Sequence, residues 1–306
     1  MTITAQIIAD SISPEGIRLT TMQLRYPRFI HAEFMTHRMF SRNASSSRAI
    51  PVAKMIEDLR RDPAMPVYWG SNKPGMQAGD EIESSMRDRA VQAWLDAMEH
   101  SIEIVEWMTE VAELHKQIAN RILEPWAHIN VVVTATDWEN FFTLRAHADA
   151  QPEIKALALE MLNAMAGNQP RHLKPGEWHL PYITDEERRD AYHGPSQTPE
   201  WDLLKKVSVA RCARVSYLTH DGRQTTVEED LQLYDRLVGA QPLHASPAEH
   251  QATPDQRTTS SYTIEYDDGA CDHVEAGEEW CNPSRHGNLR GWIQYRKTLP
   301  GENVPG

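Results

Sequence analysis

Apolar residues change their spacing several times along the chain, and each change marks an expected element of structure. Near the N-terminus, short apolar runs at residues 7–9, 17–24 and 29–35 are separated by Ser-Pro-Glu-Gly and Tyr-Pro turn signals. Runs of this length between turn residues predict strands. The β-branched segments Ile129–Val133 and Val207–Tyr217 predict two more strands.

Helical spacing dominates longer segments. From about Ile82 to Leu123, apolar residues recur at steps of three and four, and no Pro or Gly interrupts them before Pro125. One continuous helix of this span would be roughly 55–60 Å long. We therefore expect it to break or bend once, and its apolar stripe to lie in the core or a subunit interface. Shorter helices are predicted at Met55–Arg61, 138–145, Pro152–Ala166, Thr226–Val238 and about Asn288–Lys297.

Prolines become frequent and apolar periodicity disappears between Gln169 and Trp201. A long segment of this kind is typical of a linker or an active-site lid. We therefore divide the chain into a core at 1–168, a Pro-rich linker or lid at 169–205, and a second segment at 206–306 that completes the same fold. The mixture of strands and helices predicts an α/β (α+β) protein.

Composition narrows the classes of function. The 306 residues carry a net charge of −13, which argues against duplex nucleic acid as the main ligand, because that ligand needs a basic face. The only cysteines are Cys212, Cys271 and Cys281, too few for a disulfide framework. We see no signal peptide and no apolar run of the roughly 20 residues that span a membrane. These features predict a soluble, cytoplasmic protein.

The densest polar chemistry lies in residues 36–48, which hold three arginines, one histidine, four serines and one asparagine. Guanidinium groups and hydroxyls at this density suit phosphate or pyrophosphate oxygens. A solvated polar loop is the alternative. The sequence contains no Gly-x-Gly and no Gly-Lys-Ser/Thr, so any dinucleotide would have to be held by side chains and not by a glycine turn.

Three blocks of sequence resemble the flavin-dependent thymidylate synthases (the ThyX family). His37-Arg38, then seven residues, then Ser46-x-Arg48 is similar to the family signature. Asn140–Arg145 followed by Ala150–Ile154 is similar to a second family block, and His244–His250 to a third. Two weaker similarities are a degenerate copy of another block at Lys116–Pro125, with Arg121 as its nucleotide-binding arginine, and the segment Ala210–Tyr217.

The resemblance implies a ThyX-like fold, with a long twisted antiparallel-rich sheet packed against long helices. It also implies FAD-dependent reductive methylation of dUMP to dTMP, with NADPH and methylenetetrahydrofolate as co-substrates, in a homotetramer whose sites draw residues from several subunits. Arg145 would be the catalytic residue, because a fixed guanidinium stabilises charge on the uracil ring. The implied dUMP-binding residues are Glu33, Ser46, Ser47, Arg48, Arg121 and Arg145, and the implied FAD contacts are His37, Arg38, Met39, Asn43, Asn140 and Ser246.

The chain also departs from the family pattern. The His244–His250 block follows residues 36–48, which we call the phosphate loop, by about 200 residues, whereas short family members place it before that loop. Substitutions fall at Thr36, Glu33, Thr134, Thr136 and Ala49. Two alternatives therefore stay open: flavin- and folate-dependent C5 hydroxymethylation of dUMP or another pyrimidine nucleotide, and a non-catalytic nucleotide-binding homologue.

Metal binding is weighed and not predicted. His244, Glu249 and His250 lie on a turn and not at helical spacing. Cys271, His273, Cys281 and His286 lack a Cys-x-x-Cys pair, so a polar loop is favoured over a zinc site. Cys212 resembles a nucleophile only by analogy with classical thymidylate synthases, and we expect it to be a buried core cysteine.

Overall fold

A five-stranded mixed sheet lies at the centre of the computed structural model, which describes residues 3–191, 200–215, 223–240, 242–265 and 271–302. The strand order is β3-β4-β2-β1-β5. Neighbouring strands are antiparallel except for the parallel pair β1 and β5. The predicted α/β class and antiparallel-rich sheet are thereby confirmed. The strands are β1 (Thr4–Ile12), β2 (Arg18–Pro27), β3 (Ser41–Ala44), β4 (His128–Ala135) and β5 (Arg171–His172).

Alternate residues of β4 separate the two faces of the sheet. Ile129, Val131 and Val133 are fully or almost fully buried on the face that is covered by α1 (His31–Phe34), α5 (Glu139–Arg145) and α6 (Pro152–Ala166). Side chains two residues apart on a strand point to the same face. The even-numbered residues of β4 therefore face the opposite side, where Val132 packs with Tyr182 and Cys212.

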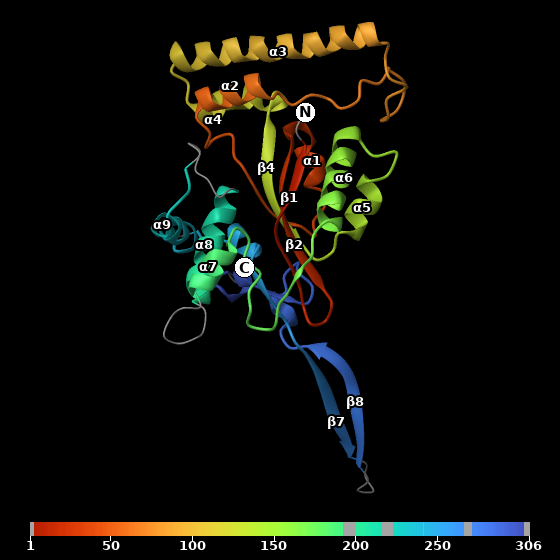
Figure 1. Ribbon diagram of the computed structural model, residues 1–306, viewed down its shortest axis with the longest axis vertical. Helices are drawn as coiled ribbons and strands as arrows, with labels where there is room; N and C mark the ends of the chain where they lie inside the picture. Colours follow the sequence, from red (N-terminus) through yellow and green to blue (C-terminus); the bar gives the residue numbers. More distant parts are fainter. Residues whose placement is uncertain (1–2, 192–199, 216–222, 241, 266–270, 303–306) are drawn as a thin grey trace.

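A helical layer crosses the end of the sheet (Figure 1). It consists of α2 (Val52–Arg61), α3 (Ser84–Glu110) and α4 (Lys116–Leu123), which bury a shared apolar cluster around Leu59, Ile102 and Leu123. The long helical pattern breaks between Glu110 and Lys116, which confirms the single break predicted from its length.

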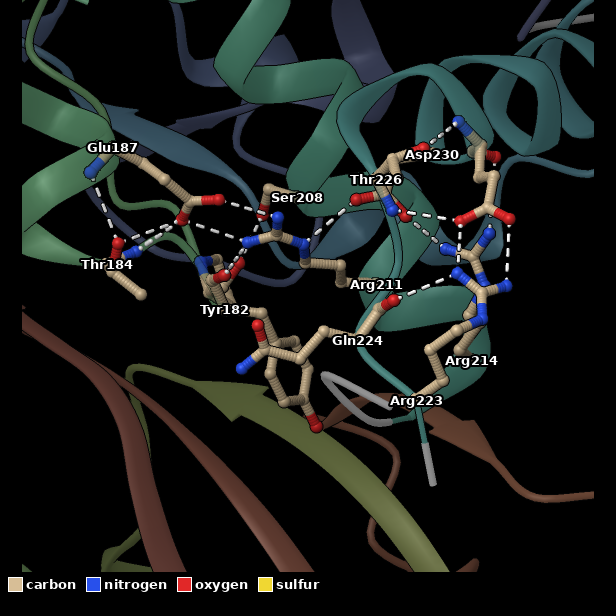
Figure 2. A network of polar contacts seen from close by, with 12 residues as sticks. Tyr182, Thr184, Glu187, Ser208, Arg211, Arg214, Arg223, Gln224, Thr226 and Asp230 are labelled. Carbon is tan, nitrogen blue, oxygen red and sulfur yellow. Dashed lines mark hydrogen bonds and ion pairs between the residues drawn. The ribbon is translucent and has the colours of Figure 1, made fainter. Parts of the chain in front are cut away.

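Helices α7 (Asp185–Ala191), α8 (Trp201–Arg214) and α9 (Val227–Val238) cover the second face of the sheet (Figure 1). An ionic network joins them (Figure 2), and we call it the arginine cluster. Its centre is Arg211, which pairs with Glu187 at 2.6 Å and with the fully buried Asp230 at 3.0 Å. Arg214 also pairs with Asp230, so one carboxylate of α9 neutralises two arginines of α8.

The C-terminal segment returns to the sheet. Strand β6 (Ala252–Pro254) pairs with β9 (Trp292–Gln294), and between them a hairpin of β7 (Arg257–Glu265) and β8 (Cys271–Trp280) projects from the body (Figure 1). Three short 3-10 helices complete this part: η3 (Ser246–Glu249), η4 (Pro283–Arg285) and η5 (Tyr295–Thr298). None of the helices among the described residues is long and apolar enough to cross a membrane.

Two predicted strands are helical. Segment 29–35 forms a 3-10 turn, Arg28–Ile30, followed by α1. Its buried residues Ile30 and Phe34 are four apart, a helical spacing that we missed because the run is short. The predicted strand 207–217 is instead the end of α8, apart from 216–217, which lie outside the described residues. Leu204, Val207 and Arg211 are buried at helical steps, which overrides the strand propensity of valine.

The predicted C-terminal helix at 288–297 is also wrong. Trp292 and Gln294 are buried on either side of the half-buried Ile293, the period of a strand, and they belong to β9 before the short η5 begins. The β7–β8 hairpin was missed, because its polar sequence shows no apolar alternation.

Candidate active site

The turn after α1 brings His37 to Arg145, which lies in the last turn of α5. The Nε of Arg145 donates to Nε2 of His37 at 3.0 Å. Phe141 supports the imidazole edge-on, with ring centroids 4.8 Å apart. Burial, and then the charges of Arg145 and Arg42, lower the pKa of His37 below its usual value. A neutral His37 has the lone pair that accepts this bond, so it orients the guanidinium and leaves its terminal nitrogens for a ligand.

Arg42 has a role that the sequence did not indicate. Its Nη1 donates to the carbonyl of Met35 at 3.0 Å and to that of His37 at 2.9 Å. These carbonyls lie in the turn that follows α1, so Arg42 fixes the turn that carries His37. From sequence alone Arg42 was one more arginine of the phosphate loop, and no local signal separated this structural arginine from Arg38, which is exposed.

The third family block joins the first in space. Asn43 on β3 lies 3.3 Å from Oγ of Ser246 and 3.0 Å from Nε2 of His250, although more than 200 residues separate them. On its other side, Nδ1 of His250 is 2.8 Å from Oγ1 of the buried Thr134. The rearranged order of the blocks therefore still places Asn43 and Ser246 side by side.

The side-chain amides of Asn288 and Gln294 hold the same loop, and the sequence predicted neither of them. Nδ2 of Asn288 donates to the carbonyl of Met39 at 2.9 Å. Nε2 of Gln294 donates to Oδ1 of Asn288 at 3.0 Å and to the carbonyl of Glu249 at 3.1 Å. These bonds fasten the loop to the segment that carries Ser246.

The second half of the phosphate loop is fixed by the helical layer. Oγ of Ser47 is buried and donates to Glu124 at 2.6 Å, and Arg121 pairs with the same carboxylate at 2.9 Å. Nδ2 of Asn120 donates to the carbonyl of Ser47 at 2.8 Å. The hydroxyl of Ser47 would have to leave Glu124 to reach a phosphate, whereas Ser46 and Arg48 are exposed.

A cavity of about 630 Å³ opens beside Ser46, on the face of the sheet opposite Arg145. It is bounded by the phosphate loop, strands β2 and β4, and helices α2, α8 and α9. Five basic side chains line it together with Asp58 and Asp62. A single chain therefore places Arg145 and Ser46 on different faces. The basic residues are Arg25, Arg28, Lys54, Arg61 and Arg214.

The remaining candidates lie at the surface around these groups. Glu33 is half-buried, and its carbonyl accepts from the hydroxyl of Thr36 at 2.7 Å. Met39 and Asn140 are exposed. Thr136 bonds to its neighbour Asp137 at 2.9 Å.

The groups weighed as metal ligands have other partners. Glu249 pairs with Arg296, and His286 lies 2.8 Å from Asp255. The side chains of Cys271 and His273 lie outside the described residues. Within the described part of the chain, no group of three or more His, Cys, Asp or Glu residues is assembled as a metal site. Cys212 is fully buried, and burial raises the pKa of its thiol, as expected of a core cysteine.

Several solved structures are similar to the chain, including these two. A UMP/dUMP methylase, PolB, from Streptomyces cacaoi bound with 5-Br UMP has a TM-score of 0.46 and 18% identity, covering 54% of this chain and 89% of that chain. The flavin dependent thymidylate synthase ThyX from Helicobacter pylori complexed with FAD and dUMP has a TM-score of 0.35 and 13% identity, covering 48% of this chain and 67% of that chain. No curated protein matches the chain.

The sequence model of a family described as thymidylate synthase complementing protein matches residues 17–171, just over half of the chain. The matched span contains the phosphate loop with His37 and the helix with Arg145. The chain therefore belongs to the thymidylate synthase complementing protein family and is a flavin-dependent thymidylate synthase-like enzyme.

Proposed function

We propose that the protein catalyses FAD-dependent reductive methylation of dUMP to dTMP, with methylenetetrahydrofolate and NADPH as co-substrates. The observation that carries the proposal is the 3.0 Å bond between Arg145 and His37, which lie 108 residues apart. This bond joins the first and second family blocks. It also orients the guanidinium of Arg145, whose Nε already donates to His37. Ser246, from the third block, lies against Asn43 of the first.

The donor set fits a flavin dinucleotide. Arg38 is exposed and suits a pyrophosphate, while Asn43, Asn140 and Ser246 supply amide and hydroxyl groups for a ring with both donors and acceptors. The flavin would supply the hydride chemistry that no side chain can perform. His37, Arg38 and Met39 would also contact the flavin.

The nucleotide is held at both ends in this proposal. Ser46 and Arg48 bind the phosphate, with Ser47 and Arg121 nearby. Arg145 stabilises negative charge on the uracil, and Glu33 contacts the nucleotide from the face that carries Arg145. Since Ser46 and Arg145 lie on different faces of one sheet, the two ends come from different subunits of a homo-oligomer. We propose a tetramer and assign no role to nucleic acid or a membrane.

Arg145 is the residue to test. Arg145→Ala should lower the rate of C5 deprotonation of dUMP roughly 10²–10³-fold, with a smaller loss of nucleotide affinity, because the charge it stabilises develops during the reaction. Arg145→Lys should rescue only in part, because an ammonium lacks the planar fork. The matched control is Arg60→Ala, an exposed arginine paired with Glu99. Isothermal titration and tritium release from C5 separate affinity from rate.

Flavin absorbance with and without dUMP decides whether the proposal stands. A colourless protein that ignores added FAD would contradict it. Bound flavin without proton exchange at C5 of any pyrimidine nucleotide would instead indicate the non-catalytic homologue. Mass spectrometry of the product separates methylation from C5 hydroxymethylation, for which 5-hydroxymethyl-dUMP is the expected product.

A further inference from the structure

A single line of hydrogen-bonded side chains, which we call the buried file, crosses the interior from the candidate site to strand β1. From Nδ1 of His250 it passes to Thr134 at 2.8 Å, and from there to Thr21 at 2.6 Å. Thr21 lies 2.8 Å from Nε2 of His179, whose Nδ1 lies 2.9 Å from Ser11. These five residues are at most 4% exposed. The outer end is Asn43, which is half-buried beside the exposed Ser246.

The file has a direction. Burial lowers the pKa of both His179 and His250 to about 3, so each ring is neutral and has one N–H donor and one acceptor nitrogen. Each threonine hydroxyl has one proton. When each threonine proton is used within the file, a bond at every link requires all donors to point the same way, from Asn43 towards Ser11 or from Ser11 towards Asn43.

The surroundings of Asn43 select one direction. With its amide nitrogen facing His250, Asn43 lies 3.0 Å from Nε2 of His250, 3.1 Å from the carbonyl of Ser246 and 3.2 Å from that of Arg42. All three are acceptors for an N–H group when Nε2 of His250 is unprotonated. With the amide reversed, its oxygen would face the two carbonyls. The amide nitrogen therefore points inward, and the oxygen lies 3.3 Å from Oγ of Ser246.

We propose that the buried file is a positioning device, in which His250 and Thr134 fix the amide of Asn43 so that it offers a carbonyl oxygen to the flavin. A carbonyl beside the Ser246 hydroxyl suits a ligand edge that donates an N–H, such as the imide of the isoalloxazine ring. This inference rests on the proposed function for the identity of the ligand. The direction of the file does not depend on that identity.

Thr134 has a structural role that its position in the sequence did not suggest. The family resemblance placed it where an asparagine helps to hold the flavin. Here its side chain is fully buried and bonds to Thr21 and His250. It acts on a ligand only through His250 and Asn43, which makes it a positioning residue and not a ligand contact.

Nitrogen NMR of the histidine rings tests the direction in the intact protein. The expected result in wild type is a neutral His250 with its proton on Nδ1 and a neutral His179 with its proton on Nδ1. A proton on Nε2 of His250 would overturn the proposal, because Asn43 would then have to turn its oxygen inward. This readout needs no ligand and no activity.

Thr134→Val tests the coupling to the site. A methyl group cannot accept from Nδ1 of His250, so the proton of His250 should move to Nε2 and the amide of Asn43 should turn over. FAD binding should weaken roughly tenfold, about the value of one neutral hydrogen bond. The matched control is Thr20→Val, because Thr20 is equally buried but bonds to Asp10 and lies outside the file. It should leave the tautomer of His250 unchanged.

The outcomes are separable. An unchanged tautomer and unchanged FAD affinity in Thr134→Val would overturn the positioning role. If Thr134→Val does not fold, the wild-type tautomers still decide the direction. If the wild-type protein binds no FAD while His250 carries its proton on Nδ1, the proposed function fails and the direction of the file stands.

Discussion

The arginine cluster of Figure 2 and the buried file between Asn43 and Ser11 fasten the second face of the molecule in opposite ways. The cluster is ionic: burial by itself lowers the pKa of Arg211, but its pairs with Glu187 and Asp230 hold that pKa above the usual value. The file is neutral, and burial keeps His179 and His250 uncharged. The cluster joins helices α7, α8 and α9 to one another, and the file joins the segments that carry His179 and His250 to the sheet.

The difference shows what each kind of contact can specify. An ion pair holds two groups together regardless of the orientation of their protons. A neutral file transmits direction, because each hydroxyl and each imidazole passes on one donor. The arginine cluster therefore suits a fixed scaffold, and the file suits the placement of an amide at the candidate site.

Removing the shared carboxylate should have the largest effect on stability. Asp230→Ala leaves Arg211 and Arg214 without this partner in the interior, and the free energy of unfolding should fall by about 3–5 kcal/mol. Urea denaturation measures the loss. Glu99→Ala, which breaks the exposed pair with Arg60, should cost at most about 1 kcal/mol. A cost below about 1 kcal/mol for Asp230→Ala would show that water reaches the cluster.

As the pH falls, the file should lose its stabilising effect at a higher pH than the cluster does. The pKa of His179 and His250 is about 3 in the folded protein and about 6.5 when unfolded. Between these values the unfolded chain binds more protons, so stability is complete above about pH 6.5 and falls as the pH drops towards 3. Each of the two imidazole rings should lower the free energy of unfolding by about 2 kcal/mol at pH 5 relative to pH 8.

The cluster should respond at lower pH. Although burial opposes it, the hydrogen bond from Arg211 lowers the pKa of Glu187 below 4.5. The stability that Glu187 contributes is present above that usual value and is lost as the pH falls through the lowered pKa. His250→Gln should therefore flatten the loss between pH 7 and 5, whereas Glu187→Gln should not. Urea titrations at several pH values measure how the free energy of unfolding changes with pH. If both variants keep the wild-type slope, the file is not the source of the pH dependence.

The sequence predicted the strands and helices better than the contacts of the candidate site. The strands β1, β2 and β4, and the helices α2, α6 and α9, follow from apolar period and turn residues, which are local signals. Residue composition singled out the phosphate loop, and the family resemblance singled out Arg145. Which arginine serves the fold was not predictable, because Arg42 differs from Arg38 only in the carbonyls that the tertiary structure brings to it.

The buried file could not be predicted from local sequence patterns either, because the tertiary structure brings its residues together. His179 lies in the Pro-rich segment predicted as a linker or lid, and nothing near it in sequence indicates a partner. It meets Thr21 across a separation of 158 residues. The division of the chain at 168 and 205, and the roles of the site residues, stay predictions.

Breaking the file in the middle should cost less than breaking the cluster. Thr21→Val removes one of the two hydrogen-bond partners of His179 and one of the two of Thr134, and the free energy of unfolding should fall by about 1–3 kcal/mol. Thr21→Ser keeps the hydroxyl and should retain most of the stability. Thermal and urea unfolding of the two variants measure the difference. Equal stability would mean that the hydroxyl contributes nothing and that packing of the methyl group decides.

The smallest expected effect is at the start of α9, the helix that supplies Asp230 to the arginine cluster. Thr226 accepts from the backbone of Glu229 at 3.3 Å, and Glu229 accepts from the backbone of Thr226 at 2.9 Å, a capping box. Thr226→Ala removes one of these two bonds and should cost about 1 kcal/mol. Asp230 still anchors the helix, so the loss should stay well below that of Asp230→Ala.

The neighbouring Thr225 provides the matched control for this cap. Among the described residues its buried hydroxyl has no hydrogen-bond partner. Thr225→Ala should therefore leave the free energy of unfolding unchanged or raise it slightly, because a buried hydroxyl without a partner is destabilising. Urea denaturation of both variants compares the two positions directly. If Thr225→Ala costs as much as Thr226→Ala, side-chain packing and not capping explains the loss, and α9 is held by the arginine cluster alone.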